Sequence, residues 1–162
     1  MEKNFHFELT TNVKSGINSI YYVFKFLKEK NFKKVGLIID ENLYKKSNYI
    51  KLFINKFKKK QILKQIFYFK GDREPTYQHL DFVIKGIRRK KNINFDCFVS
   101  IGGGSTIDFS KGVATLIKNP GNSLKYRGFP KNLKPSIPVI AIPSTTGTGS
   151  ELAYNAVFTD LN

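Results

Sequence analysis

Cysteine is nearly absent from this chain: Cys97 is the only one among 162 residues. One cysteine cannot form an internal disulfide, and Cys97 lies within an apolar run, so we expect a buried, inert thiol and a reducing cytoplasm. Long apolar runs are also missing, and none approaches the roughly 20 residues that span a bilayer. Residues 1–6 lack the continuous apolar segment of a secretory signal. These absences favour a cytoplasmic protein without membrane contact.

Acidic residues are scarce as well, with 12 against 28 basic ones, which gives a net charge of +16. Such an excess is typical of nucleic-acid-binding proteins. The basic clusters at residues 28–30, 56–60 and 88–91, however, all lie near the ends of predicted helices, where cations complement the helix dipole. Most aromatic residues lie on apolar faces rather than between these charges. Nucleic acid is therefore a disfavoured partner, and a non-catalytic basic binding module is the alternative function.

Apolar runs and amphipathic segments alternate along the chain. Strands are expected at residues 34–40, 62–69, 95–101 and 137–142, with shorter ones at 5–9 and 155–159. Helices are expected at residues 19–31, 48–60, 77–91 and 106–117, the third of them capped by Thr76. This alternation predicts an α/β architecture, in which a parallel sheet carries helices on both faces. At this length we expect one domain, residues 1–162.

The strand that ends at residue 101 is followed directly by Gly102, Gly103, Gly104 and Ser105. Three glycines let the backbone approach a phosphate closely. We expect Ser105 to cap the next helix and Asp108, three residues later, to complete a capping box. The helix N-terminus would then offer free N–H groups to a pyrophosphate. A tight turn with an ordinary cap is the alternative, because Ile107 breaks the Rossmann glycine pattern and no Walker A lysine follows.

A second loop follows the strand at residues 137–142. It combines Gly147 and Gly149 with a dense set of hydroxyl side chains. That set consists of Ser144, Thr145, Thr146, Thr148 and Ser150. Hydroxyls can donate to phosphate or ribose without adding charge, although a simple polar turn is the alternative. Two such loops at strand ends favour one shared anionic ligand, and a dinucleotide is the leading candidate.

One acidic side chain also stands at a strand end. Asp40 closes the predicted strand at residues 34–40. Its carboxylate could accept hydrogen bonds from two ribose hydroxyls, or it could cap the turn at residues 41–43. The local sequence leaves both interpretations open.

The two loops together resemble the motifs of one family. Residues 102–111 resemble the Gly-Gly-Gly-Ser-x-x-Asp-x-Ala-Lys motif of iron-containing (group III) alcohol dehydrogenases, with Ser110 in the alanine position. Residues 143–151 resemble that family's Pro-Thr-Thr-x-Gly-Thr-Gly-Ser-Glu motif, with Ser144 in place of a threonine. The resemblance implies a Rossmann-like dinucleotide-binding domain of the dehydroquinate synthase-like type. It also implies hydride transfer between an alcohol and nicotinamide.

The resemblance assigns roles to individual residues. Asp40 would lie near the adenosine ribose and favour NAD over NADP, and Gly102 to Ser105 would hold the pyrophosphate. The residues implied on the nicotinamide side are Asp108, Thr145, Thr146 and Thr148, with Ser150 in the same cofactor-binding set. Residues 74–76 and 126–128 look similar to the 3-deoxy-octulosonate 8-oxidase-like branch, which acts on sugar acids. The implied substrate is thus an alcohol or a sugar-acid hydroxyl.

The sequence lacks the metal ligands that the resemblance would imply. Family members hold a divalent metal, iron or zinc, with an Asp and several His residues from a C-terminal helical domain, and the metal polarises the alcohol oxygen. This chain has only His6 and His79, which we interpret as surface or packing residues. We therefore expect the metal-binding domain to be absent from this chain and the nucleotide-binding part to be inactive alone. The resemblance leaves a homodimer open, and a truncated gene product without independent activity is the other alternative.

Overall fold

The computed structural model of the chain describes residues 11–90, 94–128, 130 and 133–161. Its elements, in order, are η1 (Ser19–Tyr21), α1 (Tyr22–Glu29), β1 (Val35–Asp40), α2 (Glu41–Lys46), α3 (Asn48–Lys59), β2 (Leu63–Phe69), α4 (Tyr77–Arg89), β3 (Cys97–Gly102), α5 (Gly104–Lys118), η2 (Ser123–Tyr126) and β4 (Val139–Pro143). The strand expected at residues 5–9 lies outside the described residues. Among the described helices, none is long and apolar enough to cross a bilayer.

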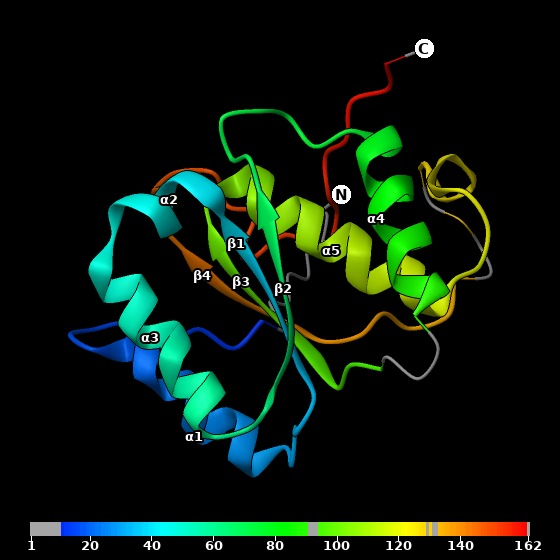
Figure 1. Cartoon of the computed structure of the whole chain (residues 1–162). Helices are drawn as coiled ribbons and strands as arrows, with labels where there is room; N and C mark the ends of the chain where they lie inside the picture. Colours follow the sequence, from blue (N-terminus) through cyan, green and yellow to red (C-terminus); the bar gives the residue numbers. More distant parts are fainter. Residues whose placement is uncertain (1–10, 91–93, 129, 131–132, 162) are drawn as a thin grey trace, which may run out of the picture.

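The four strands form one parallel sheet in the order β2-β1-β3-β4 (Figure 1). From β1 the chain runs outward to β2 and then returns across β1 to β3. The connections therefore leave β1 and β3 in opposite directions. In open α/β sheets, ligands bind in the crevice that this reversal creates at the carboxyl ends of the strands. Here that crevice lies between Asp40, the last residue of β1, and Gly102, the last residue of β3.

Alternate residues of the central strands face two separate cores, one on each side of the sheet. Leu37 and Ile39 belong to the core beneath α1 and α3, together with residues such as Phe53. Ile38 belongs to the opposite core beneath α4 and α5, together with residues such as Phe109. Figure 1 shows these two helical layers on either side of the sheet. The predicted architecture, a parallel sheet with helices on both faces, is confirmed.

Three expectations about single residues and segments can be compared directly with the structure. Cys97 is fully buried, and this burial, followed by the nearby Asp96 carboxylate, raises the pKa of its thiol to about 12. The Thr76 side chain caps α4 by accepting a hydrogen bond from the His79 N–H at 3.1 Å. The strand expected at residues 155–159 is wrong. Only Thr159 pairs, in an isolated bridge with Thr76, because this segment crosses the ends of α5 and α4 and not the sheet edge.

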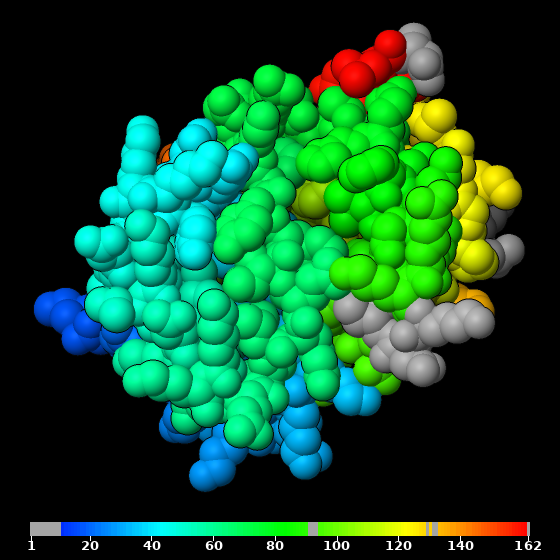
Figure 2. Space-filling model, in the orientation of Figure 1, coloured from blue at the N-terminus to red at the C-terminus, as the bar shows by residue number. Residues whose placement is uncertain are grey.

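The C-terminal segment lies beside α4 in the space-filling view, at the red end of the colour bar (Figure 2). Two hydrogen bonds fix it there: the Thr159 N–H donates to the Pro75 carbonyl at 2.9 Å, and the Tyr77 N–H donates to the Thr159 carbonyl at 3.2 Å. Phe158 packs under this bridge against Gly112 of α5, where any Cβ would come within 2.6 Å of the Phe158 ring. Residues far apart in sequence are thus joined near the carboxyl edge of the sheet.

Candidate cofactor site

Two loops predicted to share a ligand are in direct contact. The Ser144 N–H, at the start of the second loop, donates to the Gly102 carbonyl at 2.9 Å. This bond extends the pairing of β3 with β4, in which Gly102 is the partner of Pro143. The loops therefore leave adjacent strands side by side, at the carboxyl edge of the sheet.

The glycines of the first loop allow this close packing. A Cβ at Gly103 would lie 3.2 Å from Thr145 Oγ1, and a Cβ at Gly104 would lie 3.0 Å from Thr148 Cβ and 3.1 Å from Ser150 Oγ. Such separations are tighter than ordinary van der Waals contact, so side chains at these positions would push the loops apart. The two loops form one continuous surface of small polar groups, on which Thr146 is also exposed.

The second loop turns back on itself at two glycines. Gly147 and Gly149 have φ values of 92° and 68°, in the left-handed region that favours glycine. These turns keep the hydroxyl residues between and beside them on the exposed side of the loop. The hydroxyl side chains thus lie together in the loop after β4.

Helix α5 begins earlier than the sequence pattern indicates, and its cap differs. The N-cap residue is Gly103, with an extended backbone and no side-chain hydrogen bond to the helix. The predicted capping role of Ser105 and its capping box with Asp108 are wrong, because both residues already lie within the helix. The first-turn N–H groups of α5 have no side-chain cap, which is the arrangement that suits an anionic ligand.

Asp108 instead joins α5 to the C-terminal segment. Its carboxylate pairs with Lys111 Nζ at 3.1 Å and accepts the Val157 N–H at 3.0 Å. Lys111 Nζ also donates to the Asn155 carbonyl at 2.7 Å. The side chains of Asp108 and Lys111 are only 10% and 17% exposed. The sequence pattern gave no signal for this contact, because the partners lie more than 40 residues apart.

Asp40 occupies the crevice between β1 and β3. Its Oδ1 accepts the Leu43 N–H at 2.8 Å and so caps α2, which confirms the capping interpretation. Its Oδ2 lies against Gly71, in the loop after β2, where a Cβ would overlap the carboxylate. Gly71 is a site residue that the sequence motifs do not identify, because it lies in a loop outside both of them. A glycine in a turn directly after a strand was the one available signal.

The described residues offer no metal site. No three His, Cys, Asp or Glu side chains gather within the described part of the chain. His79 stacks on Phe69 and on Phe109, with ring centroids 5.8 and 4.8 Å away, and the resulting partial burial lowers the pKa of His79. The expected packing role of His79 is confirmed, and His6 lies outside the described residues.

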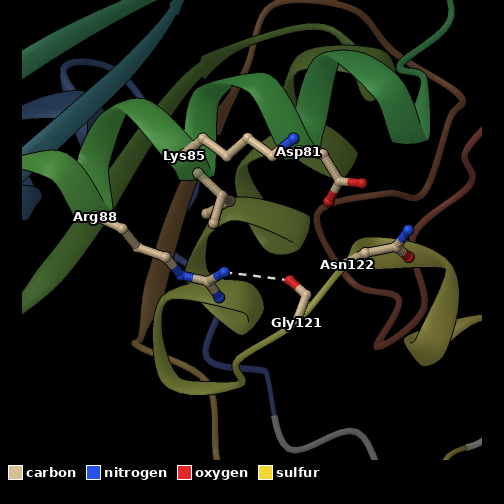
Figure 3. A pocket seen from close by; sticks show the side chains of 6 residues that line it. Asp81, Lys85, Arg88, Gly121 and Asn122 are labelled. Carbon is tan, nitrogen blue, oxygen red and sulfur yellow. Dashed lines mark hydrogen bonds between the residues drawn. The ribbon is translucent and has the colours of Figure 1, made fainter.

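A separate small pocket of about 280 Å³ opens at the other end of α5 (Figure 3). Arg88 dominates it, but its guanidinium donates to the carbonyls of Leu116, Asn119 and Gly121 at 2.8, 3.0 and 3.2 Å. The Asp81 carboxylate, on the same pocket, accepts the Ser123 N–H at 2.8 Å. These two charged groups therefore hold the C-terminal end of α5 and the following turn, and the described residues place no cluster of free cations around the pocket.

Replacing Arg88 with alanine is expected to lower the free energy of unfolding by about 1 kcal/mol, because the last carbonyls of α5 lose a charged donor. Urea denaturation followed by circular dichroism measures the change. Arg89→Ala, one position further on the exposed end of α4, is the matched control and should be close to neutral. Equal losses in both variants would contradict the role given to Arg88.

A larger groove, of about 1370 Å³, runs along the outer side of β4. Its walls include Ile140 and Ile142 of β4, the segment at residues 11–20, and Leu152 after the second loop. Residues of β4 are only partly buried, whereas those of β1 and β3 are almost completely buried. In the part of the chain that the structure describes, the sheet is thus open on this side, next to the second loop.

Comparisons with known proteins agree with this geometry. The family model described as iron-containing alcohol dehydrogenase matches residues 10–162. Alcohol dehydrogenase 4 of Schizosaccharomyces pombe is 34% identical over 136 residues, which cover 84% of this chain and 31% of that protein. The NAD-dependent methanol dehydrogenase of Bacillus methanolicus is 44% identical over 78 residues, which cover 48% of this chain and 20% of that protein.

Solved structures give the same result for the fold. The crystal structure of an iron-containing alcohol dehydrogenase superposes with a TM-score of 0.80 at 25% identity, over 98% of this chain and 43% of the other. The NADH-dependent butanol dehydrogenase A of Thermotoga maritima has a TM-score of 0.82 at 21% identity, over 98% of this chain and 39% of the other. The chain spans about a third, or less, of the length of the curated relatives described above. With a family match over almost all its residues and the same fold, this chain belongs to the iron-containing alcohol dehydrogenase family.

Proposed function

We propose that this chain is the NAD-binding part of a metal-dependent, NAD-linked alcohol dehydrogenase, with residues 1–162 as its nucleotide-binding domain. The observation that carries the proposal is the packing of the glycine loop against the hydroxyl loop, beside Asp40, at the reversal point of the sheet. Ligands of open α/β sheets bind at this point. The names of two relatives support the cofactor: an NAD-dependent methanol dehydrogenase and a sulfoacetaldehyde reductase from Bifidobacterium kashiwanohense crystallised with NAD+.

The residues present fit a dinucleotide. The uncapped first turn of α5 provides N–H donors and the positive end of a helix dipole to the pyrophosphate, at Gly102, Gly103, Gly104 and Ser105. Larger side chains at Gly103 or Gly104 would fill this phosphate-binding turn, because a Cβ there would contact Thr145 or Thr148. The hydroxyl loop then supplies neutral donors toward the nicotinamide half of the cofactor, from Thr145, Thr146, Thr148 and Ser150, with Asp108 behind them.

Asp40 supports the choice of NAD. One carboxylate oxygen caps α2, and the other has no hydrogen bond to a described side chain or backbone group, so it can accept ribose hydroxyls. A 2′-phosphate placed at the same point would meet a negative charge, which disfavours NADP. The preference follows from charge and geometry at a single side chain.

Bound NAD would supply the hydride acceptor for alcohol oxidation. The described residues do not fit a metal, so they supply no metal-assisted step themselves. An alcohol or sugar-acid substrate, a divalent metal, a homodimer and a cytoplasmic location are parts of the proposal that concern the whole enzyme. Within it, this chain binds and orients the nucleotide.

Titration of the chain with NAD and with NADP, followed by amide NMR shifts, tests the proposal. We expect saturable, millimolar or tighter NAD binding, with the largest shifts at residues 102–106 and 144–150 and weaker binding of NADP. No saturable shift at millimolar NAD would contradict it. Association with DNA that falls steeply with salt, in the absence of NAD binding, would favour the basic binding module.

A further inference from the structure

Thr106 carries a buried hydroxyl without a hydrogen-bond partner. The residue lies in the first turn of α5 and is fully buried. Among the described residues, its Oγ1 forms no hydrogen bond. Buried hydroxyls are nearly always paired, because an unpaired one loses its bonds to water without compensation. This atom therefore needs an explanation.

The usual local acceptor for such a hydroxyl receives no hydrogen bond from Thr106. A helical threonine normally bonds the carbonyl one turn before it. That carbonyl belongs to Gly102, and it accepts the Ser144 N–H at 2.9 Å, where the two loops meet. The neighbouring Ser110 hydroxyl bonds the Thr106 carbonyl at 2.8 Å and the Ser100 hydroxyl at 2.8 Å, so it uses the Thr106 backbone and not its side chain. The Thr106 hydroxyl thus forms no hydrogen bond within its own helix.

Asp40 and this hydroxyl both lie close to Gly71. A Cβ at Gly71 would lie 3.3 Å from Thr106 Oγ1, and the same Cβ would overlap Asp40 Oδ2. Thr106 Oγ1 and Asp40 Oδ2 thus face a single backbone position that has no side chain. Asp40 Oδ1 accepts the Leu43 N–H, whereas Oδ2 has no hydrogen bond within the described part of the chain, so Oδ2 is an available acceptor beside Gly71.

We propose that Thr106 is the positioning residue for Asp40: its hydroxyl donates to Asp40 Oδ2 after a small rotation of that carboxylate. This inference rests on the proposed function, because the oriented carboxylate is the group that would select NAD. Oδ1 is anchored to α2 and Oδ2 to α5, so the carboxylate plane is fixed from both sides. The second lone pairs of both oxygens then face the crevice, where the ribose hydroxyls would donate.

The same contact would couple the two halves of the nucleotide site. Thr106 belongs to the helical turn whose N–H groups face the pyrophosphate, and Asp40 ends the neighbouring strand. A hydroxyl that joins them fixes the distance between the ribose acceptor, Asp40, and the first turn of α5. Thr106 touches neither group of the cofactor directly, because it is fully buried.

The test compares three variants of the full chain: Thr106→Val, which removes only the hydroxyl from a side chain of similar shape; Thr106→Ser, which keeps the hydroxyl; and Ser110→Ala, which removes a different buried hydroxyl on α5. Calorimetry gives Kd for NAD and for NADP. We expect Thr106→Val to weaken NAD binding about five- to tenfold and leave NADP binding nearly unchanged, so the NAD preference falls. Thr106→Ser should restore the preference, and Ser110→Ala should keep it.

A second readout does not depend on cofactor. Urea midpoints of Thr106→Val, Asp40→Asn and the double variant should be non-additive, with the double variant less destabilised than the two single shifts combined. Additive midpoints together with an unchanged NAD preference in Thr106→Val overturn the inference. If the wild-type chain binds no NAD, the proposed function fails and the selection role with it. Non-additive midpoints would then still support the contact itself.

Discussion

The Gly71→Ala variant is expected to bind NAD about ten- to a hundredfold more weakly than the wild-type chain. A Cβ at Gly71 would overlap Asp40 Oδ2 and lie 2.8 Å from Asp40 Cγ. The carboxylate must therefore turn away from the crevice, or the loop after β2 must move outward. The first change removes the charged acceptor for the ribose, and the second alters the crevice around it; hydrogen bonds to charged groups are the stronger ones in proteins. Calorimetric titration with NAD measures the effect.

Gly86→Ala provides the matched control for this prediction. Gly86 lies in the exposed part of α4, and a Cβ there meets nothing within 4 Å. The same substitution should keep NAD affinity at this position and raise the free energy of unfolding by about 0.5–1 kcal/mol, since alanine favours helix. A folded Gly71→Ala variant that binds NAD as the wild type does would show that Asp40 is not the ribose acceptor.

Local patterns were enough to predict the architecture and to place the cofactor loops. Buried apolar runs that alternate with amphipathic segments identify parallel strands and helices, and β1, β2, β3 and β4 all lie where the pattern indicates. Parallel strands place their carboxyl ends on one edge, so loops at those ends come together whatever the details of packing. The glycine loop after β3 and the hydroxyl loop after β4 were therefore predictable as neighbours.

The exact start of a helix and the contacts between distant segments were not predictable in the same way. Ser105 and Asp108 fit a capping box by spacing, yet the extended backbone of Gly103 starts α5 earlier and places both inside the helix. The role of Gly71 depends on how the β2–α4 loop approaches β1, which no local pattern records. Thr106 is similar, because its hydroxyl matters only through Asp40, 66 positions earlier in the chain.

The segment at residues 155–159 shows that strand propensity alone does not predict strand pairing. Its residues Val157 and Phe158 have high strand propensity, and a strand was expected there. In the structure this extended segment crosses α5 and α4. Its backbone forms hydrogen bonds with the side chains of Asp108 and Lys111 and pairs with Thr76 at the start of α4, and among the described residues it does not pair with a sheet edge. Propensity identified the extended conformation, and tertiary contacts decided what it pairs with.

Among substitutions in the contact between α5 and residues 155–157, Asp108→Ala is expected to be the most destabilising, lowering the free energy of unfolding by about 3 kcal/mol. The change leaves the largely buried Lys111 ammonium without its carboxylate and leaves the Val157 N–H without its acceptor. Both losses expose the desolvation cost of groups that were paired. Urea denaturation of the chain measures the effect, and protection of the residue 157 amide against hydrogen exchange should fall with it.

Two further variants separate the buried pair from charge alone. Lys111→Met removes the cation but keeps an apolar stem, so the double variant Asp108→Ala/Lys111→Met should be more stable than Asp108→Ala by itself, because no unpaired ammonium remains. Glu29→Ala breaks the exposed pair with Lys25, whose side chains are 53% and 61% exposed, and should change stability by less than about 0.5 kcal/mol. If Asp108→Ala were no more destabilising than Glu29→Ala, the contact between α5 and residues 155–157 would not contribute to the free energy of unfolding.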